Sequence, residues 1–489
     1  MPMSAYTFLW HDYETFGPNP RTDRPAQFAA IRTDAELNDI GEPLMWYCQP
    51  APDFLPDPHS CLITGITPQQ CLAQGLPEHD FAARIEAELA RPGTIGVGYN
   101  TIRFDDEFTR FLFWRNLMDP YAREWQHQCG RWDLLDVVRM AYALRPEGIV
   151  WPRKPDGRPS FKLEDLTRAN GLTHDAAHDA LSDVRATIAV ARLIRQHQPR
   201  LFDFALALHK KDRVAAEIGL PVAPGGAKPF LHVSGMFAPE RGCLGIVWPL
   251  TTHPTHRNEL LVWDLAFDPG ELADLNSAAI RQRLFTAQQA LPPGVTRLPI
   301  KTIHLNKSPM VVGRLNTLRP ALAQQWGIDT EAALRHAERA AQLPDMSEIW
   351  QQVFERPATV ATEERDPDQA LYDGFVSEGD RRALNQLRAL PPQAPEWTRA
   401  TFQDARLSTL VFRYRARNFP ESLDSAESAA WLDHCVQRLT HGAPGMLSLT
   451  AFQELVDQLA EDAVARGDDR AEHVLSELMD YATYLTERW

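Results

Sequence analysis

Two acidic residues stand one position apart at the end of a predicted strand near the start of the sequence. The stretch TFLWHDYETFG, residues 7–17, runs from apolar and β-favouring residues directly into Asp12 and Glu14. Successive side chains of a strand point to opposite faces, so these two carboxylates lie close together on one face. Paired carboxylate oxygens are ligands that Mg²⁺ and Mn²⁺ prefer. The alternative is a strand end that runs into solvent, so a metal site needs further acids elsewhere.

A second pair of acids follows another predicted strand. In GVGYNTIRFDDEFTR, Asp105 and Asp106 stand where a buried strand gives way to a helix. An acid at that place also stabilises the helix by capping it and by interacting with its dipole. The residues alone therefore leave open both the role of these acids and which of the two has it.

A third acidic position begins a long helix predicted over residues 179–195. Apolar residues at helical spacing place Asp183 near its N-terminal turn, five positions after His178. His174 and Asp179 have the same spacing, so on the residues alone either histidine–aspartate pair could act. Together the three stretches supply enough carboxylates to indicate a metal site.

Composition limits the class of protein that could carry such a site. The 489 residues are enough for about three domains. A hydrophobic fraction of 44% and a charged fraction of 24% are typical of a globular protein. The net charge of −15 argues against a surface that coats nucleic acid everywhere, but it allows a local basic groove.

The cysteines and the apolar runs indicate a compartment. Six scattered cysteines form no C-x-x-C pair, which favours reduced thiols in a cytoplasm. No apolar run approaches the roughly 18 residues of a membrane span, and the N-terminus lacks an export signal. We therefore expect a cytoplasmic protein.

Hydrophobic periodicity predicts the elements that must position the acids. Residues 7–49 read as an antiparallel meander of three strands, followed by helices and a short buried strand, which is a mixed α/β arrangement. The predicted helices cover residues 78–90, 105–117, 131–144 and 179–195, and the short strand covers 94–100. Beyond a linker near Pro199, residues 228–313 offer short strand-like runs, and the sequence becomes helical from about residue 380.

These motifs resemble the DEDDh 3′-to-5′ exonucleases, which have a ribonuclease H-like fold. HDYETFG is similar to the first motif of that family, YNTIRFDDE to the second and HDALSD to the third. Within the family the sequence is similar to the bacterial exodeoxyribonuclease I group through RPAQFAAIRTD, LITGITP, RWDLLDV, ALRPEGI, HVSGMF, NTLRP and RARNFP. The resemblance implies a DEDDh exonuclease domain over residues 1–199, a small SH3-like β-rich domain over 200–352 and an all-helical domain over 353–489.

The resemblance also implies the catalytic residues and the reaction. The family's second acid directly follows phenylalanine, which selects Asp105, and the AHDA match selects His178 with Asp183. The implied metal ligands are Asp12, Glu14, Asp105 and Asp183. Two Mg²⁺ ions, replaceable by Mn²⁺, neutralise charge at the phosphate, and His178 takes the proton from the attacking water. The implied enzyme releases 5′-mononucleotides from the 3′ end of single-stranded DNA, in DNA repair and recombination.

Other residues are candidates for binding the DNA strand. By resemblance Phe16 lies beside the terminal bases, although a core position is the alternative. Arg145 and Lys162 could meet phosphates, and Tyr372 and Phe375 could stack on unpaired bases.

A protein partner is implied as well. Exonucleases of this group are expected to bind the acidic tail of single-stranded DNA-binding protein, which ends in an apolar residue. Such a pocket needs a cation beside an apolar wall, and Lys228, Arg319 and Leu334 are the candidates, with Arg339 as a second cation. Ala341 stands where a basic residue would be expected. The enzyme is otherwise expected to be monomeric, with no membrane partner.

Two other functions use the same motifs. The same metal site serves ribonucleases, because discrimination against the 2′-hydroxyl leaves no readable motif. A noncatalytic nucleic-acid-binding scaffold is the other alternative, and loss of a metal acid would favour it.

Overall fold

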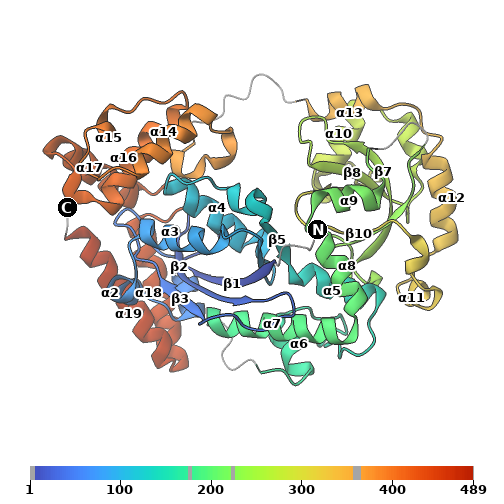
Figure 1. The fold of residues 1–489 in the computed structure, drawn as a ribbon, viewed down its shortest axis with the longest axis horizontal. Coiled ribbons are helices and arrows are strands. Elements are labelled where there is room, and N and C mark those ends of the chain that lie inside the picture. The colour runs from blue at the N-terminus through green and yellow to red at the C-terminus, as the bar shows by residue number, and fades with distance from the viewer. Residues whose placement is uncertain (1–5, 174–178, 222–225, 356–364, 488–489) are drawn as a thin grey trace. The chain divides into compact units, whose positions relative to one another are not determined.

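The computed structural model describes residues 6–173, 179–221, 226–355 and 365–487 (Figure 1). The chain divides into two compact units, each assembled from separate stretches of sequence. The first unit joins Met1–Gly130, Asp175–Arg185 and Thr362–Trp489, and the second joins Arg131–His174 and Ala186–Ala361. Within the described ranges, no helix is both long enough and apolar enough to cross a membrane.

A five-stranded sheet in the order β3-β2-β1-β4-β5 carries the first acidic motif (Figure 1). Its strands are β1 (Thr7–Thr15), β2 (Pro25–Thr33), β3 (Leu44–Tyr47), β4 (Thr94–Gly98) and β5 (Gly130–Asp133). The pairs β1–β2 and β2–β3 are antiparallel, so the predicted meander is confirmed, whereas β1 and β4 run parallel.

Two helices of the first unit pack on one face of this sheet, α3 (Glu78–Leu89) and α4 (Asp105–Arg115) (Figure 1). Leu9 and Tyr13 of β1 contact this helical layer in a buried core with Phe81 of α3 and Leu112 of α4. Because side chains alternate along a strand, residues 12 and 14 of β1 point to the other face.

The helix predicted over residues 131–144 was wrong at its start. Residues Gly130–Asp133 form β5, and helix α5 covers Leu134–Leu144. The Asp133 carboxylate accepts a hydrogen bond from the Leu135 N–H at 3.0 Å, which caps the helix. Four strand residues are too few to show a period of two before the helical pattern takes over.

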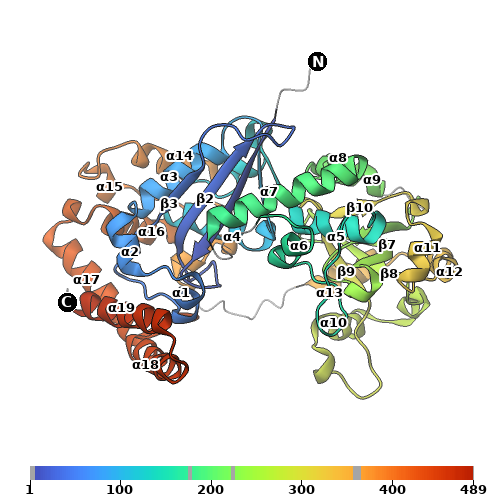
Figure 2. The same ribbon diagram turned by 90° about the horizontal axis from the view of Figure 1, so that it is seen from below.

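The C-terminal part of the first unit is helical, as predicted. Its helices are α14 (Glu378–Arg388), α15 (Glu396–Arg399), α16 (Ala405–Asn418), α17 (Ser425–His441), α18 (Leu449–Arg466) and α19 (Asp469–Thr486). Figure 2 shows α18 and α19 beside the short helices α1 (Pro58–Thr64) and α2 (Pro68–Gln74). Phe16, just after β1, is buried in the core that these helices share.

The second unit contains the predicted β-rich region. Its sheet has the order β10-β6-β7-β8-β9, and every neighbouring pair is antiparallel. The strands are β6 (Phe230–Val233), β7 (Leu244–Thr252), β8 (Glu259–Asp264), β9 (Ile300–His304) and β10 (Met310–Val312). The remaining helices are α6 (Leu163–Ala169), α7 (Ala180–His197, which begins in the first unit), α8 (Pro199–Ala207), α9 (Lys211–Ile218), α10 (Ser277–Phe285), α11 (Pro320–Gln325), α12 (Thr330–Ala340) and α13 (Ser347–Phe354).

Candidate active site

Three of the predicted metal acids come together in the first unit. One carboxylate oxygen from each of Asp12, Glu14 and Asp183 lies within 4.8 Å of the others. Strand β1 supplies the first two residues on one face, and the first turn of α7 supplies the third. Two segments about 170 residues apart in sequence therefore form one cluster, which we call the acid site.

Helix α7 is fixed at its start by Asp179. The Asp179 carboxylate accepts a hydrogen bond from the Ser182 N–H at 3.0 Å, and its carbonyl accepts one from the Asp183 N–H at 3.0 Å. These are the bonds of a helix N-cap, so Asp179 sets the position of the turn that carries Asp183. Sequence reasoning considered Asp179 only as an alternative to Asp183, although an aspartate just before a helical apolar stripe is a capping signal.

Asp105 is held against the strand that carries the first acids. The backbone N–H of Tyr13 donates to the Asp105 carboxylate at 3.0 Å, and the hydroxyls of Tyr13 and Thr109 lie 3.0 Å apart. The Thr109 hydroxyl also donates to the Asp105 carbonyl at 2.9 Å. Sequence reasoning missed Tyr13 and Thr109, because a tyrosine on a strand and a threonine on a helix carry no signal of this contact.

The two adjacent acids of the second motif have different surroundings. Asp106 is fully buried and accepts a 2.6 Å ion-paired hydrogen bond from Arg123, which is also buried. Asp105 instead adds its negative charge to those of Asp12 and Glu14. The sequence alone could not choose between Asp105 and Asp106. The two now differ physically, because Asp106 is already paired with the cation Arg123.

Electrostatics at the acid site favour the arrival of a positive charge. Burial, and then the charges of Asp105, Glu14 and Asp183, raise the pKa of Asp12 well above its ordinary value. Burial and the charge of Asp183 raise the pKa of Glu14 to about 8. Both groups resist ionisation because burial removes the water that would solvate their charge and because nearby carboxylates repel it.

This donor set fits divalent metal ions. Hard divalent cations take carboxylate oxygens, and the cluster offers several that are close together and partly shielded from water. A bound cation would reverse the repulsion that raises the pKa values of Asp12 and Glu14.

The predicted general base, His178, lies outside the described residues, as does the alternative His174. His11, next to Asp12 in sequence, is buried, and its ring Nδ1 lies 3.2 Å from the Leu9 carbonyl. Burial lowers the pKa of His11 to about 4, so the ring is neutral near pH 7. Because strand side chains alternate, His11 points away from the acid site.

The side chains of the first unit that are predicted to contact DNA differ in solvent exposure. The Phe16 side chain is 1% exposed and packs against Phe54. This burial matches the core alternative, because a side chain enclosed in a core offers no face to a base. Tyr372 is partly exposed and accepts a hydrogen bond from Arg110 at 3.0 Å, whereas Phe375 is 91% exposed.

The other predicted contacts belong to the second unit. Lys162 is exposed and lies 3.5 Å from the Glu164 carboxylate. Arg145 donates to the Thr317 carbonyl at 3.0 Å and lines a cavity of about 630 Å³. Lys228 is exposed, and Leu334 is exposed on α12. Arg319 forms an ion pair with Glu147, and Arg339 forms one with Asp268.

Family models match three successive parts of this chain. The model described as "Exonuclease" matches residues 9–191, the exonuclease I SH3-like domain matches 209–356, and the exonuclease I C-terminal domain matches 365–485. The first match contains all the residues of the acid site, and the other two agree with the predicted β-rich and helical regions.

Individual relatives are similar to this chain over nearly its full length. Exodeoxyribonuclease I of Escherichia coli (strain K12) is 48% identical over 93% of this chain and 94% of its own length. The zinc ion-bound form of the E. coli ExoI–ssDNA complex superimposes with a TM-score of 0.89 at 45% identity, covering 99% of this chain and all of that chain. A structure of SSB/exonuclease I with an inhibitor gives a TM-score of 0.88 at 44% identity, covering 99% and 100%.

The fold, the acid site and these similarities over almost the whole length lead to one assignment. The chain is a nuclease that belongs to the exodeoxyribonuclease I family.

Proposed function

We propose that this enzyme degrades single-stranded DNA from the 3′ end and releases 5′-mononucleotides, with a role in DNA repair and recombination. The observation that carries the proposal is the gathering of Asp12, Glu14 and Asp183 in a chain of this family. A relative whose solved structure contains single-stranded DNA and zinc supports both the substrate and the need for a metal.

The proposed metal is Mg²⁺, with Mn²⁺ as a substitute and two ions in the site. Asp12, Glu14 and Asp183 would hold the metal, and Asp105 completes the donor set. When bound, divalent cations neutralise charge at the phosphate and lower the pKa of water. The chain itself orients the carboxylates through the Tyr13 contact to Asp105 and the Asp179 cap of α7.

The proposed proton acceptor is His178, whose ordinary pKa of about 6.5 suits a base near neutral pH. We expect His178→Ala to lower kcat by about 100-fold or more, while DNA binding survives, because general-base catalysis contributes factors of this order. His174→Ala is the matched control and should change kcat little. Exchanged effects of the two substitutions would assign the base to His174.

The proposed grip on the strand uses aromatic and basic side chains. Phe375 lines an apolar cavity of about 80 Å³ in the first unit, together with Tyr121 and Trp114. An exposed ring beside such a cavity suits stacking on an unpaired base. Tyr372 lies three residues away, and Lys162 would meet phosphates.

The test of substrate class uses matched oligonucleotides of DNA and RNA, single and double stranded, labelled at the 5′ or the 3′ end. We expect early mononucleotide release from the 3′-labelled single-stranded DNA, activity that requires Mg²⁺ or Mn²⁺, and none in a chelator. Faster release from RNA would instead assign a 3′-to-5′ exoribonuclease. Binding of DNA without any release would assign a scaffold.

The proposed partner is the acidic tail of single-stranded DNA-binding protein, supported by a relative solved as an SSB/exonuclease I structure. Within the second unit, the cavity of about 630 Å³ has the required chemistry. Cations Arg145, Arg200 and Arg314 line it beside apolar residues such as Leu144 and Phe204. Arg319 belongs to the same region, because its charge acts on Arg145.

Tail binding is measured by fluorescence anisotropy with a labelled acidic peptide. We expect Arg145→Ala and Arg319→Ala to weaken binding, and higher salt to weaken it in the wild type, because the contact pairs opposite charges at an exposed rim. Lys228→Ala separately tests whether the tail site extends to that predicted residue, which weaker binding would show. Unchanged affinity in both arginine variants would reject this cavity as the tail site.

We further propose domain limits at residues 1–199, 200–352 and 353–489, a monomeric state and a cytoplasmic location. The ranges of the three family models support the limits. All six cysteines are buried and none of them forms a disulfide bond, which supports a reducing compartment.

A further inference from the structure

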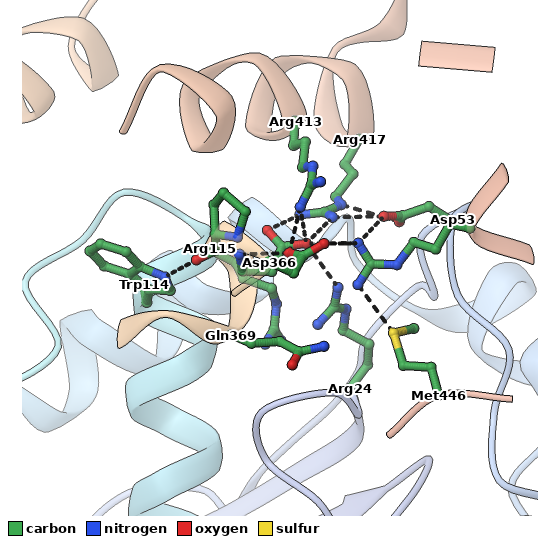
Figure 3. Close-up of polar contacts among 12 residues, drawn as sticks. Arg24, Asp53, Trp114, Arg115, Asp366, Gln369, Arg413, Arg417 and Met446 are labelled. Carbon is green, nitrogen blue, oxygen red and sulfur yellow. Dashed lines mark hydrogen bonds and ion pairs between the residues drawn. The ribbon is translucent and has the colours of Figure 1, made fainter. Parts of the chain in front are cut away.

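A second group of charges, buried except for the partly exposed Asp366, shares no residue with the acid site and lies where C-terminal helices of the first unit meet the loops after β1 and β3 (Figure 3). We call it the charged cluster. Its members are Arg24, Asp53, Asp366, Asp368, Arg413, Arg417 and Arg438, linked by ion pairs.

The carboxylates of this cluster have several cationic partners each. Asp368 is fully buried and lies 2.5 Å from Arg417, 3.2 Å from Arg413 and 3.3 Å from Arg438. Asp53 is also fully buried and lies 2.7 Å from Arg417. These acids are therefore already satisfied by three of the four arginines.

Arg24 is the exception among the cluster's arginines. Its side chain is 3% exposed, and its nearest carboxylate oxygen, on Asp368, is 3.8 Å away. Within the described part of the chain, its Nε, Nη1 and Nη2 atoms have no hydrogen-bond acceptor. Its guanidinium lies over the ring of Phe54 at 5.6 Å. The buried polar edge of Arg24 thus lacks a partner.

Two acids outside the cluster, Asp23 and Glu78, interact with the charge of Arg24, but neither accepts a hydrogen bond from it. Asp23 accepts hydrogen bonds from Asn19 and Thr22. Arg115, whose positive charge also acts on Arg24, donates from Nε to the Glu78 carboxylate at 3.1 Å. Burial and the charges of Arg115 and Arg417 lower the pKa of Arg24 to about 9.

The ion pairs of the cluster point to the kind of ligand that fits. Within ion-pair distance the four guanidinium groups share three carboxylates, and the N–H groups of Arg24 are hydrogen-bonded to none of them. A buried charge without a hydrogen-bonded counter-charge is costly, and a water molecule would satisfy the N–H groups without supplying one. We propose that Arg24 binds one small monovalent inorganic anion of the chloride class on its unpartnered edge.

The test measures stability of the full chain against anion identity at constant ionic strength. We expect the wild type to melt at a higher temperature in chloride or bromide than in gluconate, a bulky organic anion. For one site, each tenfold rise in chloride above its dissociation constant should raise the folding equilibrium constant about tenfold. Arg24→Met should melt at the same temperature in all three salts.

Arg415→Met is the matched control. Arg415 is equally buried, but it pairs with Glu427 outside the cluster, so its loss should lower stability while the response to chloride remains. Anomalous scattering from wild-type crystals grown in bromide gives a second measurement that does not need a folded variant. We expect a bromide peak beside the Arg24 guanidinium. A water molecule there, together with equal melting temperatures in chloride and gluconate, would overturn the proposal.

Discussion

The acid site and the charged cluster both bury carboxylates in the first unit, but their titration behaviour is opposite. At the acid site, burial and mutual repulsion raise the pKa values of Asp12 and Glu14. In the charged cluster, the guanidinium of Arg417 and its neighbours outweigh burial and hold the pKa values of Asp53 and Asp368 well below the ordinary range.

The difference lies in where the positive charge comes from. The charged cluster has arginines in the fold, so its acids hold segments of the chain together without any ligand. The three acids of the acid site raise one another's pKa values, and we propose that their counter-charge comes from a bound metal. Comparing the two regions therefore separates acids that hold the fold from acids proposed to act on a substrate.

The largest expected effect comes from removing one charge at the acid site. Asp12→Asn should lower exonuclease activity by about 1,000-fold or more, because metal charge stabilisation is worth several kcal/mol. Its melting temperature in chelator should stay equal to that of the wild type or rise, because repulsion is relieved. Activity and circular dichroism melts of the same preparation check this. A large loss of stability would place Asp12 with the structural acids.

The adjacent pair Asp105 and Asp106 gives a sharper form of the comparison. Asp106→Asn breaks the buried pair with Arg123 and should cost about 3–5 kcal/mol of unfolding free energy. Asp105→Asn should mainly reduce activity and Mn²⁺ binding, measured by titration calorimetry. If both variants lost stability equally and neither lost Mn²⁺ binding, the distinction drawn between the two residues would fail.

Within the charged cluster, Asp368→Asn should destabilise the protein without changing the rate of catalysis. The variant leaves three arginines short of a carboxylate, so we expect a loss of about 3–5 kcal/mol in urea unfolding. The fraction that stays folded at low temperature should retain the wild-type kcat. A stable variant with low kcat would instead link the cluster to catalysis.

The smallest effect concerns pH. Because the folded pKa values of Asp53 and Asp368 are depressed, their stabilisation is complete above the unfolded value of about 3.9 and is lost as pH falls through the folded values. Urea unfolding from pH 6 to pH 3 should therefore show a smaller difference in unfolding free energy between wild type and Asp368→Asn as pH falls. A difference that grew on acidification would contradict the lowered pKa of Asp368.

Sequence reasoning predicted the acid site better than the charged cluster for a physical reason. Asp12 and Glu14 lie on one strand and Asp183 begins a helix, so local periodicity indicates their faces. Asp53 and Arg417 are 364 positions apart, and each alone is an ordinary charged residue. No local pattern could predict that they meet.

Prediction of the secondary structure and of the core was also limited to what local sequence patterns reveal. The meander over residues 7–49 follows from strong alternation and turn signals, and it is confirmed. Strand β5 was missed because its four residues merge with a helical pattern. The burial of Phe16 could not be read from its own stretch, since its core partners come from the final helices.

That shared core has a consequence for how the protein is made. Phe16 is synthesised long before Leu478, Tyr481 and Leu485 of the same core, which follow about 460 positions later. At about 5–20 residues per second, some 20–90 s separate them. During that interval the segment after β1 has no finished core, so the nascent nuclease completes its first unit only once the residues of α19 have been made.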